Sequence, residues 1–303
     1  MEVRPLAELR AADAASFGGK SASLGELIAG EIPVPPGFAL SADARAEPMP
    51  GAVREAIVAA YEALGDDPPV AVRSSAIGED SAEATFAGQQ ESYLWVRGAD
   101  AVCEAVRDCW ASLHGERATS YRERLGPAGE APAMGVAVQV MVDAAVSGVM
   151  FTCNPVSGDP STIAVNASWG LGLAVVGGEV TPDEYRMSKV TGEVLQRTVS
   201  SKDLKYVAGE SGGAVRVDVP DDQREEPCLD DAQLEALVEF GRRVERHFGA
   251  HQDIEWAIGR EGELFILQSR PVMTRRVKPG PTAPRSAMDL VMDTFGARRT
   301  ETS

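Results

Sequence analysis

The sequence is short of several residue types, and each shortage excludes a class of protein. Its 303 residues include only four cysteines. These form neither a CxxC pair nor a metal-ligand spacing, so we expect reduced thiols in a cytosolic protein. No apolar run approaches the ~20 residues of a membrane helix, and the first 20 residues lack the apolar region of a signal peptide. We therefore expect a cytoplasmic protein that does not contact a membrane.

Positive charge is also scarce. The chain has 46 acidic and 29 basic side chains, a formal net charge of −17, and only five of the basic residues are lysines. Because phosphate backbones require a basic surface, this balance argues against nucleic acid as a partner. The remaining composition, 44% hydrophobic and 25% charged, is that of a globular protein. At roughly 100–200 residues per domain, the length predicts about two compact lobes.

Hydrophobic periodicity predicts a mixture of helices and strands. A helix is expected from residue 21 to the proline cluster at 33–36, and the Gly- and Pro-rich segment 125–132 is the clearest linker. We expect an α+β fold with lobes at 1–130 and 131–274 and a tail at 275–303, whose short apolar stripe packs on its own domain or on a partner. Further helices are predicted at 52–64, 99–124 and 231–248, and strands at 69–73, 136–142, 148–152, 162–167 and within 185–199.

A lysine follows a glycine pair at the start of the first predicted helix. Gly18-Gly19-Lys20-Ser21 is not a P-loop, because that motif requires glycine at position 14, where Ala14 stands. Backbone N–H groups at a helix start can still face an anion, and the ammonium adds a point charge. The sequence leaves open whether Lys20 contacts phosphate or only solvent.

An arginine leaves a predicted buried strand and is followed by small residues. Arg73 precedes two serines, and a loop with Gly88 and Ser92 comes next. Arginine gives bidentate contacts to phosphate oxygens, and small residues let backbone amides approach the same anion. A surface arginine with serine caps is the alternative.

A hairpin is predicted at 253–258 and 264–270. Pairing Gly259 with Leu264 places Glu255 opposite Gln268 and Asp253 opposite Arg270. A carboxylate beside an amide oxygen suits Mg²⁺ that bridges phosphates, although an exposed ladder of polar residues fits the same pattern. The pairing also puts Ala257 and Ile266 on the face of Glu255, and Trp256, Ile258, Phe265 and Leu267 on the core face.

Gln139 is a polar residue inside the Val-rich strand at 136–142, where it either lines a site or faces water.

Ten short motifs in a fixed order, over about residues 15–274, resemble the nucleotide-binding domain of phosphoenolpyruvate synthase, pyruvate phosphate dikinase and rifampicin phosphotransferase. They are Gly-Gly-Lys-x-x-x-Leu (18–24), Val-Pro-Pro-Gly-Phe (34–38), Val-Arg-Ser-Ser-Ala (72–76), Phe-Ala-Gly-Gln-Gln (86–90), Val-Gln-x-Met-Val (138–142), Ser-Gly-Val-x-Phe-Thr-x-Asn-Pro (147–155), Trp-Gly-Leu-Gly (169–172), Pro-Asp-x-Tyr (182–185), Asp-Ile-Glu-Trp-Ala (253–257) and Leu-Gln-Ser-Arg-Pro (267–271).

The resemblance implies an ATP-grasp fold, with ATP between two lobes, and assigns a role to each candidate residue. By this resemblance Glu255 and Gln268 bind Mg²⁺, and Gln139 lies on the adenine side of the cleft. Two departures from the family pattern are Ser92, where relatives often have threonine, and Leu173, where many have glutamate. The same resemblance assigns phosphate contacts to Lys20, Arg73 and Arg270, and the loop that covers the phosphates to Gly88 and Ser92.

In relatives the phosphoryl acceptor is a histidine on a separate swivelling domain. The three histidines of this chain, His114, His247 and His251, lack the Thr-x-His setting of that residue. We therefore expect an ATP-dependent phosphotransferase domain or subunit that passes a phosphoryl or pyrophosphoryl group to a histidine on a partner. Two alternatives remain open: a stand-alone ATP-grasp enzyme acting on a small molecule, and a nucleotide-binding regulatory module.

Overall fold

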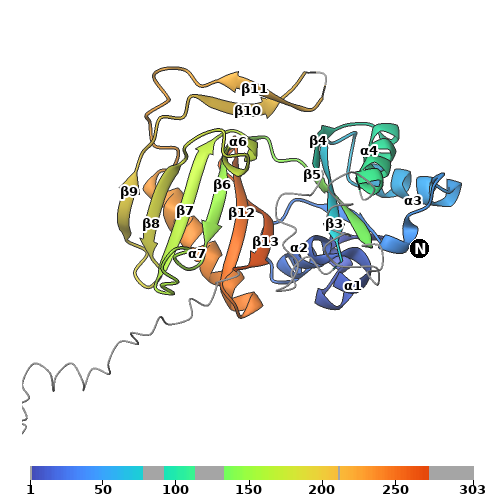
Figure 1. Cartoon of the computed structure of the whole chain (residues 1–303), viewed down its shortest axis with the longest axis horizontal. Coiled ribbons are helices and arrows are strands. Elements are labelled where there is room, and N and C mark those ends of the chain that lie inside the picture. Colours follow the sequence, from blue (N-terminus) through green and yellow to red (C-terminus); the bar gives the residue numbers. More distant parts are fainter. Residues whose placement is uncertain (1, 78–91, 113–132, 211, 273–303) are drawn as a thin grey trace, which may run out of the picture. The chain divides into compact units, whose positions relative to one another are not determined.

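The computed structural model describes residues 2–77, 92–112, 133–210 and 212–272. Met1–Val272 form one compact unit that contains two antiparallel sheets and a separate two-stranded ribbon (Figure 1). The α+β class predicted from the sequence is confirmed. Among the described residues, no helix combines the length and the apolar character that a membrane span requires.

The first sheet has five antiparallel strands in the order β1-β2-β5-β3-β4. Helices α3 (Gly51–Glu62) and α4 (Ala99–Ser112) pack together and contribute Ile57, Val106 and Trp110 to its core. The strands are β1 (Val3–Pro5), β2 (Gly37–Leu40), β3 (Val70–Ala76), β4 (Ser92–Val96) and β5 (Met134–Val140).

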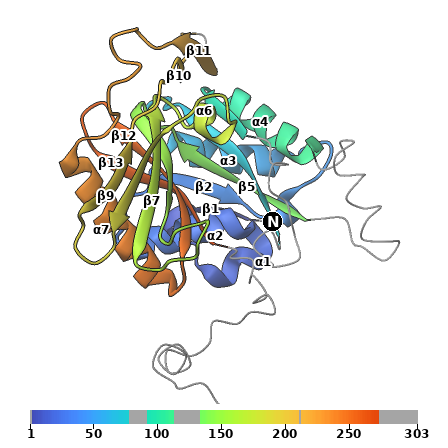
Figure 2. The same ribbon diagram turned by 60° about the vertical axis from the view of Figure 1, so that its left-hand side comes forward.

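The second sheet has six antiparallel strands in the order β13-β12-β6-β7-β8-β9. Helix α7 (Asp231–Phe248) packs on one face of it (Figure 2). Asp230 caps this helix by accepting from Gln233 N, and Gly249, at φ +67°, ends it in the left-handed conformation that glycine adopts readily. The strands are β6 (Ala144–Phe151), β7 (Thr162–Trp169), β8 (Asp183–Ser188), β9 (Val194–Thr198), β12 (Gln252–Gly259) and β13 (Leu264–Pro271).

Helix α2 (Gly19–Ala29) contacts strands of both sheets. Leu24 and Leu27 belong to the core of the six-stranded sheet, and Ser23 Oγ donates to Ser269 O at 2.7 Å. At the other end of the helix, a Cβ on Gly18 would lie 2.1 Å from Ser75 O, so only glycine permits this close approach to β3. Short helical turns precede α2 or join the strands: η1 (Leu6–Glu8), η2 (Ala11–Asp13), α1 (Ala14–Phe17) and η3 (Ala42–Ala44).

A ribbon of β10 (Leu204–Ala208) and β11 (Ala214–Asp218) lies above α6 (Leu173–Val176) in Figure 1. Leu171 N donates to Tyr206 O at 2.9 Å, and Tyr206 OH donates to Glu179 Oε1 at 3.0 Å. The ribbon is therefore attached next to the loop that carries the Trp-Gly-Leu-Gly motif. The sequence patterns did not predict this two-stranded ribbon.

Most predicted elements are confirmed, with small changes of length. The helix expected at 231–248 has those bounds, and the strand region expected within 185–199 consists of two strands, β8, which begins at Asp183, and β9. Of the helix expected at 99–124, residues 99–112 are helical; its remainder, the linker at 125–132 and the tail at 275–303 lie outside the described residues. The division into lobes at residue 130 stays a prediction, and β5, which follows that position, pairs in the five-stranded sheet.

Candidate functional site

The hairpin β12–β13 carries the predicted pair of oxygen ligands. Glu255 lies opposite Gln268, and Asp253 lies opposite Arg270, as the sequence predicted. Gln268 is 7% exposed, while Glu255 is half-buried, so both oxygen-bearing side chains are partly withdrawn from solvent.

The end of the hairpin nearer the turn differs from the prediction. Ile258 pairs with Leu264, and Gly259 N donates to Glu263 O at 2.9 Å, which shortens the predicted turn by one residue. The register shifts between Glu255 and Trp256, which leaves Leu267 as the extra residue of a β-bulge.

The bulge reverses the predicted faces of two residues. Ile266 is fully buried with Trp256 in the core under α7, and Leu267 packs with Ala257 on the pocket side. The prediction that Ile266 shares the face of Glu255, and that Leu267 lies in that core, was wrong because an inserted residue breaks the period of two. Phe265, also predicted as core, lies opposite Ala257 and is only half-buried.

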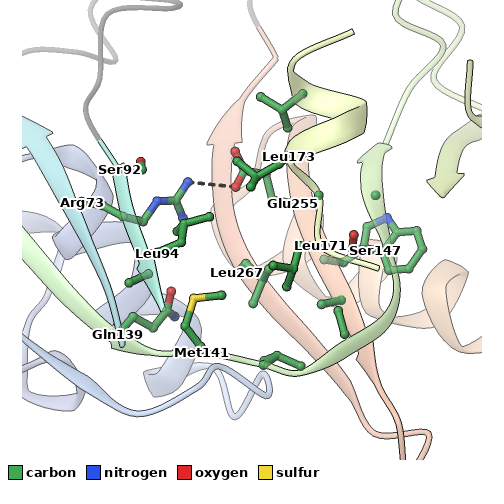
Figure 3. Close-up of a pocket in the computed structure, with 18 of the residues that line it drawn as sticks. Arg73, Ser92, Leu94, Gln139, Met141, Ser147, Leu171, Leu173, Glu255 and Leu267 are labelled. Atoms are coloured by element: carbon green, nitrogen blue, oxygen red, sulfur yellow. Dashed lines mark hydrogen bonds and ion pairs between the residues drawn. The ribbon is translucent and has the colours of Figure 1, made fainter. Parts of the chain in front are cut away.

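Arg73 reaches this hairpin from strand β3 of the other sheet. Its Nη2 donates to Glu255 Oε2 at 2.9 Å (Figure 3). The same nitrogen donates to Gln268 Oε1 at 2.9 Å. The side chains of Arg73 and Glu255 are 17% and 29% exposed, so solvent screens their ion pair only in part. Arg73, which the sequence proposed separately from the Glu255–Gln268 pair, is thus brought into direct contact with both residues.

A cavity of about 180 Å³ adjoins this cluster. Arg73, Ser92 and Glu255 lie at its polar end, and most other lining side chains are apolar (Figure 3). A mostly apolar cavity with a few convergent polar groups is typical of a small-molecule site. The larger apolar side chains of the lining are Leu94, Met141, Val142, Leu171, Leu173, Val176 and Leu267.

Gln139 and Ser92 also line the cavity. Gln139 is 3% exposed, and its Nε2 lies 3.5 Å from Pro35 O, so the alternative that it faces water was wrong. Ser92 begins β4 and pairs with Arg73 in the strand register. Gly88, which the sequence assigned to the same loop, lies outside the described residues.

The other two predicted cations lie beside the site rather than on the cavity wall. Lys20 Nζ donates to Ser74 O at 3.2 Å, directly after Arg73 in β3. Arg270 Nε donates to Asp253 Oδ2 at 2.8 Å, and the Arg270 side chain is 47% exposed. Burial raises the pKa of the Asp253 carboxyl, which the neighbouring arginine opposes.

The sequence analysis missed most of the apolar wall of this cavity. Met141 and Leu171 stand inside two of the motifs, Val-Gln-x-Met-Val and Trp-Gly-Leu-Gly, but neither was assigned a role. Leu267 lines the cavity only because of the bulge. Membership of a motif indicates that a residue is functionally or structurally important, whereas the face of the sheet on which its side chain lies depends on the strand register.

The oxygen pair fits a hard divalent cation. Within the described residues no group of three or more His, Cys, Asp or Glu side chains could hold a metal ion alone. The carboxylate of Glu255 and the amide oxygen of Gln268 nevertheless converge on one cationic nitrogen, Nη2 of Arg73. Oxygen donors of these types suit Mg²⁺, which is held by few protein groups and completed by substrate phosphates and water.

The family model of the pyruvate phosphate dikinase AMP/ATP-binding domain matches residues 44–289. The chain belongs to this family of AMP/ATP-binding domains, as its motifs predicted. This membership supports ATP as a ligand of the chain.

Relatives of known name carry this domain as part of a longer chain. A probable phosphoenolpyruvate synthase of Methanothermobacter thermautotrophicus is 40% identical over 312 residues, covering 88% of this chain and 45% of that protein. The phosphoenolpyruvate synthase of Pyrococcus furiosus is 44% identical, covering 75% of this chain and 29% of its own. A rifampicin phosphotransferase from Streptomyces is 44% identical, covering 76% of this chain and 26% of its own. This chain therefore spans less than half the length of these relatives.

Among solved structures, the fold shows a distant likeness to the D-alanyl-alanine synthetase A of Vibrio cholerae O1. The TM-score is 0.40 and the sequence identity is 14%, with 95% of this chain and 62% of that chain covered.

Proposed function

We propose that this chain binds Mg·ATP in an ATP-grasp arrangement and transfers a phosphoryl or pyrophosphoryl group to a histidine on a separate swivelling domain or partner chain. The observation that carries the proposal is the contact of Arg73 with Glu255 and Gln268 at the polar end of an apolar cavity. Family membership makes ATP the ligand to test first.

Each predicted residue that the structure describes has a place in this scheme. The adenine ring occupies the apolar end beside Gln139, and the phosphates extend toward Arg73 and Ser92. Glu255 and Gln268 would hold Mg²⁺, which when bound neutralises phosphate charge. Lys20 and Arg270 flank this end of the site, on α2 and β13.

Phosphoryl transfer needs little covalent help from a protein, so the task of these residues is positioning and charge neutralisation. Preorganised cations at the phosphates stabilise the charge that develops in the transition state. The chain supplies three such cations, Lys20, Arg73 and Arg270, within a molecule whose net charge is −17.

The histidines favour an acceptor on another domain. His247 lies 3.2 Å from Glu26 and His251 lies 3.2 Å from Glu245, and neither lines the cavity. His114 lies outside the described residues. A histidine that accepts phosphate must reach the end of the phosphate chain, which supports an acceptor other than His247 and His251. The expected cytoplasmic location stays a prediction.

The proposal is tested by ³¹P NMR of ATP turnover with the chain alone, with candidate small-molecule acceptors, and with a protein that carries a swivelling histidine domain. We expect turnover and an acid-labile phosphoprotein only with the histidine partner, and neither with its His→Ala variant. The spectrum also separates AMP plus phosphate from ADP. Turnover with a small acceptor and no partner would overturn the proposal in favour of a stand-alone enzyme.

A further inference from the structure

One atom of Arg73 occupies the point where the two oxygen ligands converge. The hydrogen bonds to Glu255 Oε2 and to Gln268 Oε1 both use Nη2, at 2.9 Å each, rather than two different nitrogens of the guanidinium. Figure 3 shows the bond to Glu255. The two acceptors come from neighbouring strands of one sheet, and the arginine comes from the other sheet. A cationic nitrogen thus lies where this oxygen pair would hold a metal.

A metal ion and this guanidinium exclude each other at that point. Mg²⁺ binds oxygen at about 2.0–2.1 Å, so a nitrogen 2.9 Å from both oxygens fills the same space. Hydrogen bonds between charged groups are also the stronger ones, and the Arg73 and Glu255 side chains are only 17% and 29% exposed. A metal that arrives alone must therefore displace a well-held cation of the protein itself.

A polyphosphate changes this competition because it offers Arg73 other acceptors. Arginine forms bidentate hydrogen bonds with phosphate oxygens. Arg73 and its strand partner Ser92 both line the polar end of the cavity, where phosphates would enter. Transfer of the guanidinium to phosphate would leave the Glu255 and Gln268 oxygens available to the metal.

We infer that Arg73 is a place-holding cation: it occupies the metal position of the Glu255–Gln268 pair without nucleotide and moves to the phosphates when Mg·ATP binds. The inference rests on the proposed function. It makes metal and nucleotide binding mutually dependent, and by linkage each ligand strengthens the other by the same factor, roughly 5–150-fold in typical cases.

The test measures metal binding with no nucleotide present. Mn²⁺ serves as the probe, and its free ion is followed by electron paramagnetic resonance. Removing the place-holder in Arg73→Met should tighten Mn²⁺ binding at least about fivefold, the low end of typical coupling. The double variant Arg73→Met, Glu255→Gln should lose this gain, because one oxygen ligand loses its charge.

Arg260→Met is the matched control. Arg260 is 62% exposed and pairs with Asp143 on the surface. The Arg260→Met substitution therefore removes the same charge as Arg73→Met, but far from the oxygen pair. If Arg73→Met binds Mn²⁺ no more tightly than the wild type, or Arg260→Met tightens it equally, the inference is wrong. The first result would mean that the ion pair is purely structural, and the second that only net charge matters.

A second measurement, the unfolding temperature with and without Mn²⁺, keeps the inference testable if Arg73→Met is less stable than the wild type. A ligand that binds the folded state raises the unfolding temperature, so Mn²⁺ alone should raise that of Arg73→Met more than that of the wild type. An equal rise would contradict the inference. With a non-hydrolysable ATP analogue, the wild type should bind Mn²⁺ and the analogue cooperatively, and Arg73→Met should show weaker coupling, because only the direct contact between metal and phosphates then remains.

These outcomes separate the inference from the proposed function. Turnover of Mg·ATP with a histidine partner, together with unchanged Mn²⁺ binding in Arg73→Met, overturns the place-holder and leaves the phosphotransferase standing. Tighter Mn²⁺ binding in Arg73→Met, together with no phosphoryl transfer from ATP by the wild type to a histidine partner, supports the place-holder and overturns the phosphotransferase.

Discussion

Lys202 donates a 2.6 Å hydrogen bond to Asp183, and both side chains are completely buried. Asp183 stands at the start of β8, in the Pro-Asp-x-Tyr motif, and also accepts from Ser200 N at 3.0 Å and Cys228 N at 2.8 Å. Lys202 Nζ also donates to Ser200 O at 2.7 Å. This ion pair fixes the segments on either side of the β10–β11 ribbon to the six-stranded sheet.

Replacing Lys202 by methionine should lower the free energy of unfolding by about 3–5 kcal/mol, because it leaves a buried carboxylate unpaired. Urea unfolding measures the change. Lys205→Met, three residues away on a half-buried position, should cost within about 0.5 kcal/mol. The double variant Lys202→Met, Asp183→Asn should recover part of the loss; a single variant as stable as the wild type would contradict this account.

Truncating Met141 should weaken adenine-nucleotide binding without affecting the phosphate end. Met141 lines the apolar part of the cavity, and each buried methylene contributes about 0.8 kcal/mol, so Met141→Ala should raise Kd roughly three- to tenfold. Isothermal titration with a non-hydrolysable ATP analogue measures it. Val156→Ala, at a position 95% exposed, is the control. An unchanged Kd for Met141→Ala would show that the base binds elsewhere.

Removing either flanking cation should reduce turnover more than nucleotide binding. Lys20→Ala and Arg270→Ala each remove a charge expected to act on the transferring phosphates, so we expect a loss of about 10²–10³ in kcat. The rate of ATP consumption with the phosphoryl acceptor measures it. Arg260→Ala, whose side chain is 62% exposed, should retain the wild-type rate. Near wild-type rates in either variant would refute its assigned role.

Glu245 should contribute stability that depends on pH. Burial raises the pKa of its carboxyl, but hydrogen bonds from Lys189, Thr152 and His251 outweigh burial and hold it below its ordinary value of 4.5. A carboxyl whose pKa is lowered by folding stabilises the protein above its unfolded-state pKa, and loses this effect as pH falls through the folded-state value.

Glu245→Gln should therefore destabilise the protein by about 1–2 kcal/mol at pH 7, the usual contribution of hydrogen bonds to a charged group. The difference from the wild type should narrow as the pH falls below 4.5, which urea unfolding between pH 8 and pH 3 can follow. A gap that stays constant across this range would mean that the charge of Glu245 does not stabilise the fold.

The register of the β12–β13 hairpin shows how far sequence reasoning reaches. Counting residues placed Glu255 opposite Gln268 because two deviations offset each other: the turn is one residue shorter than predicted, and the bulge inserts one residue. The same count assigned Ile266 and Leu267 to the wrong faces of the hairpin, because a bulge inserts one residue. No residue type in this stretch indicates a bulge.

By itself, the sequence determined the α+β class and the family, and it proposed Arg73, Glu255 and Gln268 as site residues, because strand and helix periods, turn residues and motif order are local properties of the chain. Only the tertiary structure decided that Arg73 would bond both oxygens through one nitrogen, that Gln139 would be buried, and that Lys202 would lie in the interior. These facts depend on segments up to 195 residues apart in the sequence meeting in space, and no local pattern encodes which atoms then come into contact.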